Sequence, residues 1–306
     1  MRFIKKIKKF LFDEKTRFFY LSKCGFYRTM DDARYLEKIY KYKFGKDLSL
    51  ENPKTFNEKL QWLKLHDRKP EYTSMVDKYE AKKYVSSIIG EEYIIPSLGI
   101  WDKFDDIDFD ALPDQFVLKC THDSGGLVVC RDKSKLHIKK AKSKINSSMK
   151  KNFFWVGREW PYKNVKPMII AEKYMEDSST AELRDYKFFC FDGNPEALFV
   201  ATDRQKEGEE VKFDFFDMDY NHLNLRNGHK NSDSIPQKPQ QFELMKDLAR
   251  KLSQGIPHIR IDFYEVDGKV YFGEMTFFHF SGLVPFEPNE WDYKFGELIK
   301  LPPQTN

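Results

Sequence analysis

Hydrophobic and polar positions alternate in some stretches of the chain and recur at helical spacing in others. Short apolar runs predict strands at residues 93–101, 116–119, 127–130 and 168–175, and the very basic stretch 132–151 predicts a helix between the last two. Further strands are predicted at 185–203, around a hairpin turn at Asp192-Gly193, and at 211–220 and 258–278. A helix that ends at Gly255 precedes the last of them. Helices mixed with antiparallel hairpins indicate the α+β class.

The first 66 residues predict helices, and residues 76–90 predict a helix that ends at Gly90. In the opening stretch "MRFIKKIKKFLFDE", apolar and lysine side chains fall on opposite helical faces. We expect an ordinary amphipathic helix that packs on the body of the protein. A helix that rests on an anionic membrane through residues 1–12 is the alternative.

Composition narrows the class of protein. The 306 residues are 41% hydrophobic and 33% charged, which indicates a folded soluble protein. A net charge of +4 from 52 basic and 48 acidic residues argues against a nucleic-acid-binding surface. Four cysteines without CxxC spacing favour reduced thiols in the cytoplasm. No apolar run approaches the ~20 residues that a membrane span needs.

The stretch "FVLKCTHDSGGLVVC" interrupts two predicted strands with a cation, small polar residues and two glycines. Backbone N–H groups and hydroxyls of such a loop can bind phosphate oxygens, and glycines permit close approach. Lys119 adds a positive charge at the base of the loop. An ordinary hairpin is the alternative, because Ser-Gly-Gly between strands is weak evidence alone. Neither a Walker A loop nor a GxGxxG fingerprint is present.

The last hairpin places Arg260, Asp262, Glu274 and Thr276 on its two arms. A two-residue loop would put Asp262 and Glu274 on opposite faces, so we predict a three-residue loop, Val266-Asp267-Gly268, which puts them together. Two adjacent carboxylates then favour a Mg²⁺ ion between them. A solvent-facing surface is the alternative, and the phenylalanine-rich flank "GEMTFFHFSGLVPF" argues against it.

Taken together, these motifs resemble those of the ATP-grasp fold and, more narrowly, of the TupA-like ATP-grasp proteins. The resemblance runs from about residue 52 to residue 301 and rests on "NPKTFNEKLQWLK", "DKYEAKKYV", "FVLKCTHDSGG", "AEKYM", "DYKFFCFDG" and "RIDFYEVDGKVYFGEMTF". It implies an α+β ATP-grasp fold, with two subdomains that grip ATP. We expect an N-terminal helical region at 1–66 and an ATP-grasp domain at 67–306, with its lid at about 97–171 and its catalytic subdomain at about 172–301.

The resemblance also implies the residues that bind ATP. The phosphates would be bound by Lys119, by the loop residues His122, Ser124, Gly125 and Gly126, and by Lys187 and Lys78, the last from the helix before the lid. Glu172 would accept from the exocyclic amine of adenine, while Lys173, Tyr174 and Met175 contact the ring. Asp185 would contact the ribose. Each of these residues has an alternative as surface charge, strongest for Lys78 and Lys187.

For the chemistry, the resemblance implies Mg²⁺ bound by Asp262 and Glu274, with Arg260, Lys119 and Lys187 as catalytic cations. Many ATP-grasp enzymes have Asn two residues after the metal glutamate, where this chain has Thr276, which puts a second metal in doubt. Of the other histidines near the motifs, His258 and His279 are expected to be structural.

The implied activity is an ATP-dependent ligase that joins an amine to an acidic sugar or an amino acid through an acyl phosphate. The family is often encoded among genes for capsule and other surface polysaccharides, so we expect a cytoplasmic protein, with the inner face of the cell membrane as an alternative site. Two rivals stay open: a glycosyltransferase, for which Asp217-Met218-Asp219 is the candidate carboxylate pair, and a nucleotide-binding scaffold without catalysis.

Overall fold

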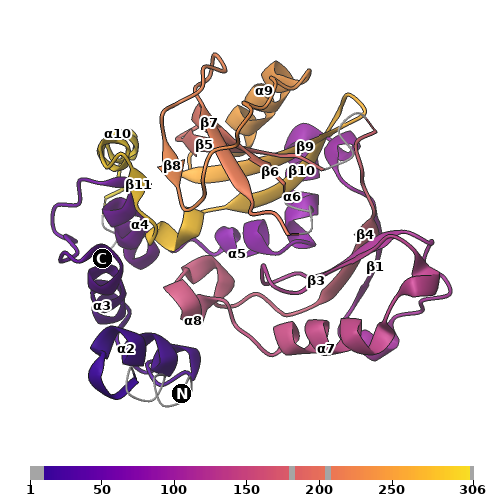
Figure 1. The fold of residues 1–306 in the computed structure, drawn as a ribbon, viewed down its shortest axis with the longest axis horizontal. Helices are drawn as coiled ribbons and strands as arrows, with labels where there is room; N and C mark the ends of the chain where they lie inside the picture. Colours follow the sequence, from indigo (N-terminus) through magenta and orange to yellow (C-terminus); the bar gives the residue numbers. More distant parts are fainter. Residues whose placement is uncertain (1–9, 179–182, 204–207, 304–306) are drawn as a thin grey trace.

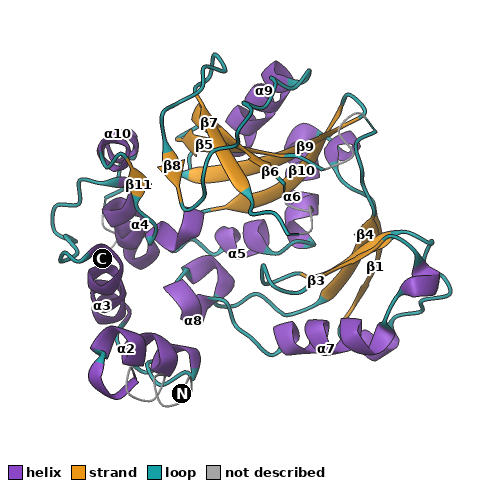
Figure 2. Cartoon of the chain, in the orientation of Figure 1, coloured by secondary structure: helices purple, strands orange, loops and turns teal. Residues whose placement is uncertain are grey.

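The computed structural model describes residues 10–178, 183–203 and 208–303 of the chain (Figures 1 and 2). Its first part is helical, as predicted, with α2 at Glu14–Lys23, α3 at Asp32–Phe44 and α4 at Phe56–His66. A capping box starts α4, because Thr55 and Glu58 satisfy each other's backbone N–H groups. Most of the segment 1–12, for which an amphipathic helix was expected and membrane contact was the alternative, lies outside the described residues. Within those ranges, no helix has the length and apolarity needed to cross a bilayer.

Two short helices lead into the lid, α5 at Glu71–Val76 and α6 at Glu80–Ile89. The predicted single helix over 76–90 is therefore wrong in its first turn. Asp77 Oδ1 accepts hydrogen bonds from the backbone N–H groups of Tyr79 and Glu80 at 2.8 and 2.9 Å, which turns the chain there. As a result, Lys78 lies in the turn between the two helices and not on a helix.

The lid is a four-stranded antiparallel sheet in the order β1-β4-β2-β3. Its strands are β1 at Ser97–Trp101, β2 at Phe116–Cys120, β3 at Leu127–Cys130 and β4 at Ile169–Lys173, and all four were predicted. Helix α7 at Ile138–Met149 packs on one face, where Ala141 and Ile145 meet Phe116 and Leu118 in a small core. The short helix α8 at Phe154–Gly157 follows.

A five-stranded sheet in the order β10-β9-β5-β6-β7 forms the second part. Its strands are β5 at Asp185–Phe191, β6 at Asn194–Thr202, β7 at Lys212–Phe216, β9 at Ile259–Val266 and β10 at Lys269–Thr276. Helix α9 at Phe242–Leu252 packs on β5, β6 and β9 and also contacts α6, while α5 and α6 both contact the edge strand β10. The remaining elements are β8 at Arg226–Asn227, β11 at Phe286–Glu287 and α10 at Glu290–Leu298. Single 3-10 turns lie at Glu91–Tyr93, Phe104–Asp106, Lys133–Lys135, Trp160–Tyr162 and His279–Gly282.

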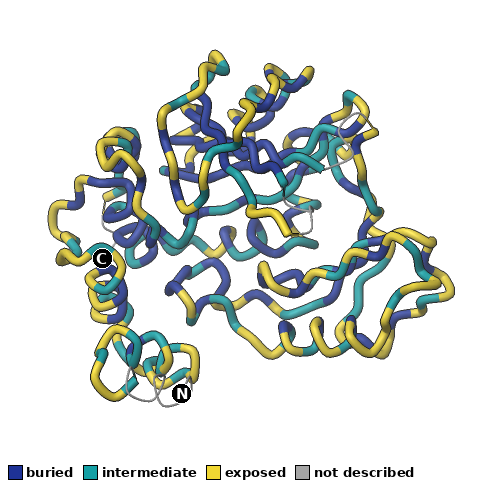
Figure 3. Tube along the Cα trace, viewed as in Figure 1, coloured by how far each residue is buried: buried dark blue, intermediate teal, exposed yellow. Residues whose placement is uncertain are grey.

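The main core is built largely from phenylalanines of this larger sheet, whose strands are the buried centre in Figure 3. Helix α4 contributes Phe56 and Leu60 to the same core, whereas α3 packs in a separate cluster with Phe18. The boundary at residue 66 stays a prediction, although the packing of α4 ties it to the body. All four cysteines are free thiols, as predicted.

The loop of the last hairpin differs from its prediction. Val266 pairs with Lys269, so the loop has two residues, Asp267 and Gly268, both with positive φ. The extra residue lies further along, where the register shifts between Phe272 and Glu274. This bulge at Gly273 places Glu274 opposite Asp262, which is the arrangement that the predicted longer loop was meant to achieve.

We predict that a buried histidine makes the fold sensitive to acid. His258 Nδ1 lies 3.0 Å from the carbonyl oxygen of Cys190, and burial lowers the pKa of His258 to about 3. In the unfolded chain, the imidazole of His258 is protonated below about pH 6.5, whereas in the folded chain it stays neutral until much lower pH. The free energy of unfolding should therefore fall as the pH drops from 6.5 toward 3, by about 1.4 kcal/mol per pH unit from this group.

Urea unfolding at a series of pH values measures this effect. In His258→Phe, whose ring fits among Phe56, Phe189 and Phe191, the slope against pH should be smaller by that amount. Equal slopes in the two proteins would contradict the assignment.

Candidate active site

Three neighbouring strands bring polar side chains to one face of the five-stranded sheet. In the strand register, Asp262 of β9 lies between Glu274 of β10 and Lys187 of β5. Two residues along β9, Arg260 lies opposite Thr276. Side chains of directly opposed residues point to the same face of a sheet. The register therefore gathers two carboxylates, two cations and a hydroxyl in one place.

The buried Asp262 carboxylate is bound by two cations. Nε and Nη2 of Arg260 donate to its two oxygens at 2.7 and 2.8 Å, and the Lys187 ammonium forms an ion pair with Oδ2. Burial alone would raise the pKa of Asp262, but Arg260 and Lys187 outweigh it and lower that pKa. Asp262 is therefore ionised inside the protein.

Arg260 connects Asp262 to the rest of the site. Its Nη2 donates to Thr276 Oγ1 at 3.0 Å and lies 3.9 Å from Glu274 Oε2. Its Nη1 lies 2.8 Å from His279 Nδ1. Thr276, predicted as a metal ligand, thus also receives a hydrogen bond from the guanidinium. His279, expected to be structural, lies in direct contact with the same group.

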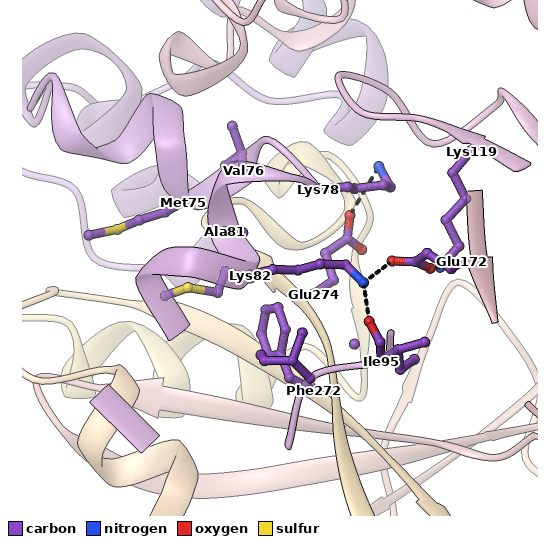
Figure 4. A pocket seen from close by; sticks show the side chains of 13 residues that line it. Met75, Val76, Lys78, Ala81, Lys82, Ile95, Lys119, Glu172, Phe272 and Glu274 are labelled. Carbon is purple, nitrogen blue, oxygen red and sulfur yellow. Dashed lines mark hydrogen bonds and ion pairs between the residues drawn. The ribbon is translucent and has the colours of Figure 1, made fainter. Parts of the chain in front are cut away.

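Three lysines from three elements line one pocket (Figure 4). Lys82 on α6 and Lys119 on β2 each place Nζ 2.5 Å from one oxygen of Glu172. Lys78 donates to the backbone carbonyl of Asp123 at 2.5 Å and lies 3.8 Å from Glu274 Oε1. The turn before α6, the helix itself and the lid sheet therefore converge on the same cavity.

The charges of this pocket do not balance. Burial alone would raise the pKa of Glu172, but Lys119 and Lys82 outweigh it and hold that pKa at about 2. The pocket thus holds three lysines, Lys78, Lys82 and Lys119, beside two acidic residues, Glu172 and Glu274. The excess of positive charge suits an anionic ligand, and lysine is a common phosphate-binding residue.

A second, more apolar pocket adjoins the first and shares Ile95, Lys119 and Glu172 with it. Its other lining residues come from the lid strands, from the linker after β4 and from the large sheet: Val117, Leu127, Val129, Lys173, Tyr174, Met175, Leu183 and Tyr264. A flat apolar group can bind here while an attached anion extends toward the lysines. The linker residues Lys173, Tyr174 and Met175 thus line the same pocket as Lys119, and their contact with adenine stays a prediction.

The glycine loop is only partly as expected. Ser124 and Gly125 are exposed, while Gly126 packs against Cys120. His122 is buried, and its Nε2 lies 3.2 Å from the carbonyl oxygen of Ser148 on α7. The ring of His122 is therefore directed into the lid, away from the loop surface where a phosphate contact was predicted.

Asp185 was predicted to contact the ribose and Lys187 to bind phosphate, but both side chains are buried and lie next to each other. Asp185 is buried at the start of β5, with Oδ1 3.2 Å from Lys187 Nζ. Burial lowers the pKa of Lys187, although Asp262 works against that shift. Within the described residues, neither side chain lines the two pockets.

Sequence comparison decides the family. The model of the TupA-like ATP-grasp family matches residues 58–300, which is most of the chain. The chain belongs to the TupA-like ATP-grasp family. The resemblance and the α+β ATP-grasp fold predicted from the sequence are thereby confirmed. No curated protein shows significant sequence similarity to this ATP-grasp chain.

Solved structures with a similar fold are distant in sequence. D-alanine–D-alanine ligase from Helicobacter pylori is 14% identical over 74% of this chain and 61% of its own, with a TM-score of 0.41. The Bacillus anthracis D-alanine–D-alanine ligase complexed with ATP is 15% identical over 74% and 68%, with a TM-score of 0.40. The ATP-grasp ligase PsnB with minimal precursor, Mg and ADP is 11% identical over 72% and 57%, with a TM-score of 0.38. This chain thus spans about three fifths of the length of these ligases.

Sequence reasoning missed Lys82 in this ATP-grasp site. It follows Lys78 by four residues in "DKYEAKKYV", a spacing of about one turn in the helix predicted over 76–90. That spacing could have suggested a second lysine beside Lys78, but it does not distinguish Lys82 from its neighbour Lys83. In the structure, Lys83 forms a surface ion pair with Glu80. The choice between the two lysines required the packing of α6.

A divalent cation has carboxylate ligands available at the opposed pair Asp262 and Glu274. No cluster of three or more His, Cys, Asp or Glu side chains suited to a metal occurs in the described parts of the chain. Mg²⁺ commonly takes one or two carboxylates together with water and substrate phosphates, so the pair still fits it. Asp262 Oδ1 accepts only from Arg260 Nε and keeps a lone pair for a metal, whereas Oδ2 already accepts from both Arg260 Nη2 and Lys187 Nζ.

We predict that Glu172 holds the lysines in place. In Glu172→Gln, Lys82 and Lys119 would lose their buried counter-charge, so the free energy of unfolding should fall by roughly 2–4 kcal/mol. Glu176→Gln, an exposed change just beyond β4, is the matched control and should stay within about 0.5 kcal/mol of the parent. Urea unfolding measures both, and equal effects would contradict the role of Glu172.

Proposed function

We propose that this protein is an ATP- and Mg²⁺-dependent ligase that joins a carboxylate to an amine through an acyl phosphate. The observation that carries the proposal is the convergence of Lys78, Lys82 and Lys119 beside the opposed carboxylates Asp262 and Glu274. Cations for a triphosphate and carboxylates for a divalent metal are the two requirements of phosphoryl transfer from Mg-ATP. The distant ligases named above have the same general activity in their names.

In this proposal, ATP spans the two adjoining pockets. Adenine takes the apolar pocket, against the backbone of Lys173–Met175, with the side chain of Met175 on its face and Glu172 toward its amine. The phosphates extend past Lys119 and Lys82 toward Lys78. The backbone N–H groups of Ser124 and Gly125 would close over them from the lid, because a glycine lets the backbone approach closely. The N–H group of Gly126 instead donates to Asp123 Oδ1 at 3.0 Å and helps to shape the loop.

Asp262, Glu274 and the Thr276 hydroxyl would hold Mg²⁺, which would supply positive charge against the phosphates of ATP. Arg260 stabilises the negative charge that develops on the transferred group, and Lys187 keeps Asp262 ionised and oriented. Because these groups are already fixed by their mutual hydrogen bonds, little reorganisation is needed during the reaction.

The reaction has two steps. An oxygen of the acceptor carboxylate attacks the γ-phosphorus of ATP, and ADP leaves with the electrons of the broken P–O bond. The amine nitrogen then attacks the carbonyl carbon of the acyl phosphate, and inorganic phosphate leaves as the amide bond forms. The protein supplies positioning and charge stabilisation, without a covalent nucleophile.

We infer an acidic sugar or an amino acid as the carboxylate substrate and an amino compound as its partner, in surface-polysaccharide synthesis. The candidate motif of the rival glycosyltransferase, Asp217-Met218-Asp219, supports a local turn in this structure. Asp217 accepts hydrogen bonds from the backbone N–H groups of Asp219 and Asn221 at 3.0 and 2.8 Å, so its carboxylate caps a turn. A scaffold that binds nucleotide without catalysis stays the second candidate, since it would keep the same lysines.

For location, we propose a cytoplasmic protein whose N-terminal end contacts the inner face of the cell membrane. Four large apolar or aromatic residues near the N-terminus are exposed, with relative accessible areas of 56%, 85%, 59% and 67% for Leu11, Phe12, Tyr20 and Phe26. They are close in sequence to the lysines at positions 5, 6, 8 and 9. Apolar side chains beside basic ones suit the interface of an anionic bilayer.

Binding of Mg-ATP tests the proposed function first. A ligand at 100 times its Kd should raise the free energy of unfolding by about 2.7 kcal/mol, which is visible as a higher Tm. We expect this shift with Mg-ATP and not with Mg-UDP-glucose, and a smaller shift in Glu274→Gln. Release of ADP that requires both glucuronate and an amino-acid mixture would then support the ligase over the scaffold. A shift with Mg-UDP-glucose alone would overturn the proposal.

Membrane contact is tested by sedimentation with vesicles. We expect the protein to co-sediment with vesicles that contain phosphatidylserine and to stay in solution with phosphatidylcholine alone. Phe12→Ser should weaken sedimentation several-fold, whereas Ile235→Ser, an exposed apolar residue elsewhere, serves as the control and should not. Equal sedimentation of both variants would contradict the contact.

A further inference from the structure

The guanidinium of Arg260 has nearly all of its hydrogen atoms committed. Nε donates to Asp262 Oδ1, Nη2 donates to Asp262 Oδ2 and to Thr276 Oγ1, and Nη1 faces His279 Nδ1. A guanidinium has five N–H bonds, so among the described residues one hydrogen on Nη1 is left for a reactant. Nη1 has two hydrogens, and His279 Nδ1 faces one of them. The direction of the other hydrogen therefore depends on how His279 orients Nη1.

The protonation of His279 follows from the residue behind it. His279 Nε2 lies 2.8 Å from Asn227 Oδ1, while Asn227 Nδ2 donates to the carbonyl oxygens of Val284 and Pro285 at 3.2 and 2.9 Å. Because both carbonyls only accept, the orientation of the Asn227 amide is fixed, and its Oδ1 faces the ring. The hydrogen of the neutral ring must therefore be on Nε2, which leaves Nδ1 as an acceptor for Arg260.

The backbone after His279 is held equally firmly. Phe280, Ser281 and Gly282 have φ of 47°, 58° and 58°, a run of left-handed residues that costs energy and needs support. Gln61 on α4 donates to the carbonyl oxygens of Ser281 and Gly282 at 3.1 and 2.7 Å. The Nζ atom of Lys64 donates to the same Ser281 carbonyl at 2.7 Å. This support fixes the path of the chain on which His279 lies.

The electrical surroundings keep the His279 ring neutral. The ring is buried between β5, β6 and β9, and its charged or titratable neighbours are Arg260, His258, Lys187 and His229. Burial first, and the charge of Arg260 next, lower the pKa of His279 well below its usual value. Among these neighbours there is no carboxylate to favour an imidazolium.

We propose that Asn227 and His279 are positioning residues of the phosphoryl-transfer step. Asn227 holds His279 in its Nε2–H tautomer, and Nδ1 then orients Nη1 of Arg260 so that the remaining hydrogen faces the reactants. This inference rests on the proposed function, because it assigns the oriented hydrogen to that reaction. It adds two residues that act through Arg260 and do not themselves touch substrate.

The first test concerns the ring alone and is independent of ligase activity. In ¹⁵N NMR spectra of the protein with labelled histidines, the signals lost in His279→Asn identify His279. We expect the Nε2–H tautomer and no titration between pH 8 and 5.5. An Nδ1–H tautomer, or a titration midpoint near 6.5, would overturn the proposal whatever the fate of the ligase assignment.

The second test compares two replacements of His279 by release of ADP from Mg-ATP with glucuronate and amino acids. His279→Phe keeps a ring but removes the acceptor, and kcat should fall roughly 10- to 100-fold with little change in the KM for ATP. In His279→Asn, an amide oxygen can replace Nδ1, so a large part of the loss should be recovered. Equal losses in two folded variants would overturn the positioning role.

Asn227→Asp provides a pH-dependent signature. A carboxylate beside Nε2 favours the imidazolium, which cannot accept from Arg260, so ADP release should fall on the acid side more steeply than in the parent. Thermal unfolding checks that the variant is folded, and the Mg-ATP shift checks that nucleotide binding is intact. An unchanged pH profile in a folded variant that binds Mg-ATP would contradict the role of Asn227. Failure of the parent to bind Mg-ATP would instead count against the proposed function.

Discussion

The site depends on one constraint: a carboxylate buried in a sheet must be paired with cations. Asp262 is 1% exposed, and Arg260 and Lys187 together hold it ionised. Burial of an unpaired charge would cost several kcal/mol, so these cations cannot be separated from Asp262 without loss of the arrangement. This buried network fixes the positions of the groups around it, since Arg260 in turn binds Thr276 and faces His279.

The lysine pocket follows a different balance. There Lys82 and Lys119 share Glu172. Lys78 donates to the carbonyl oxygen of Asp123 and lies 3.8 Å from the carboxylate of Glu274. The pocket is therefore ordered by ion pairs yet keeps an excess of positive charge. A polyphosphate can neutralise that excess, which explains how one cavity can be stable and still receive an anion.

Much of the fold could be predicted from the sequence because its signals are local. Short apolar runs marked the four lid strands, and Asp192-Gly193 marked the tight turn of a hairpin. Ordered motifs also identified the family. Local signals failed where the direction of a side chain depends on tertiary packing. The ring of His122 is directed toward Ser148, and Lys82 points into the pocket while Lys83 points to solvent.

By itself, the sequence determined which residue types were available and which strands would present them: Lys119 on a lid strand, Asp262 and Glu274 on the arms of one hairpin. Tertiary structure decided how they meet. The two-residue turn would have separated the carboxylates, and the bulge at Gly273 reunites them. Likewise, Asn227 reaches His279 only because β8 pairs with β11. The reason is physical: side-chain alternation is fixed along a strand, whereas register and contacts between distant segments are set by packing of the whole chain.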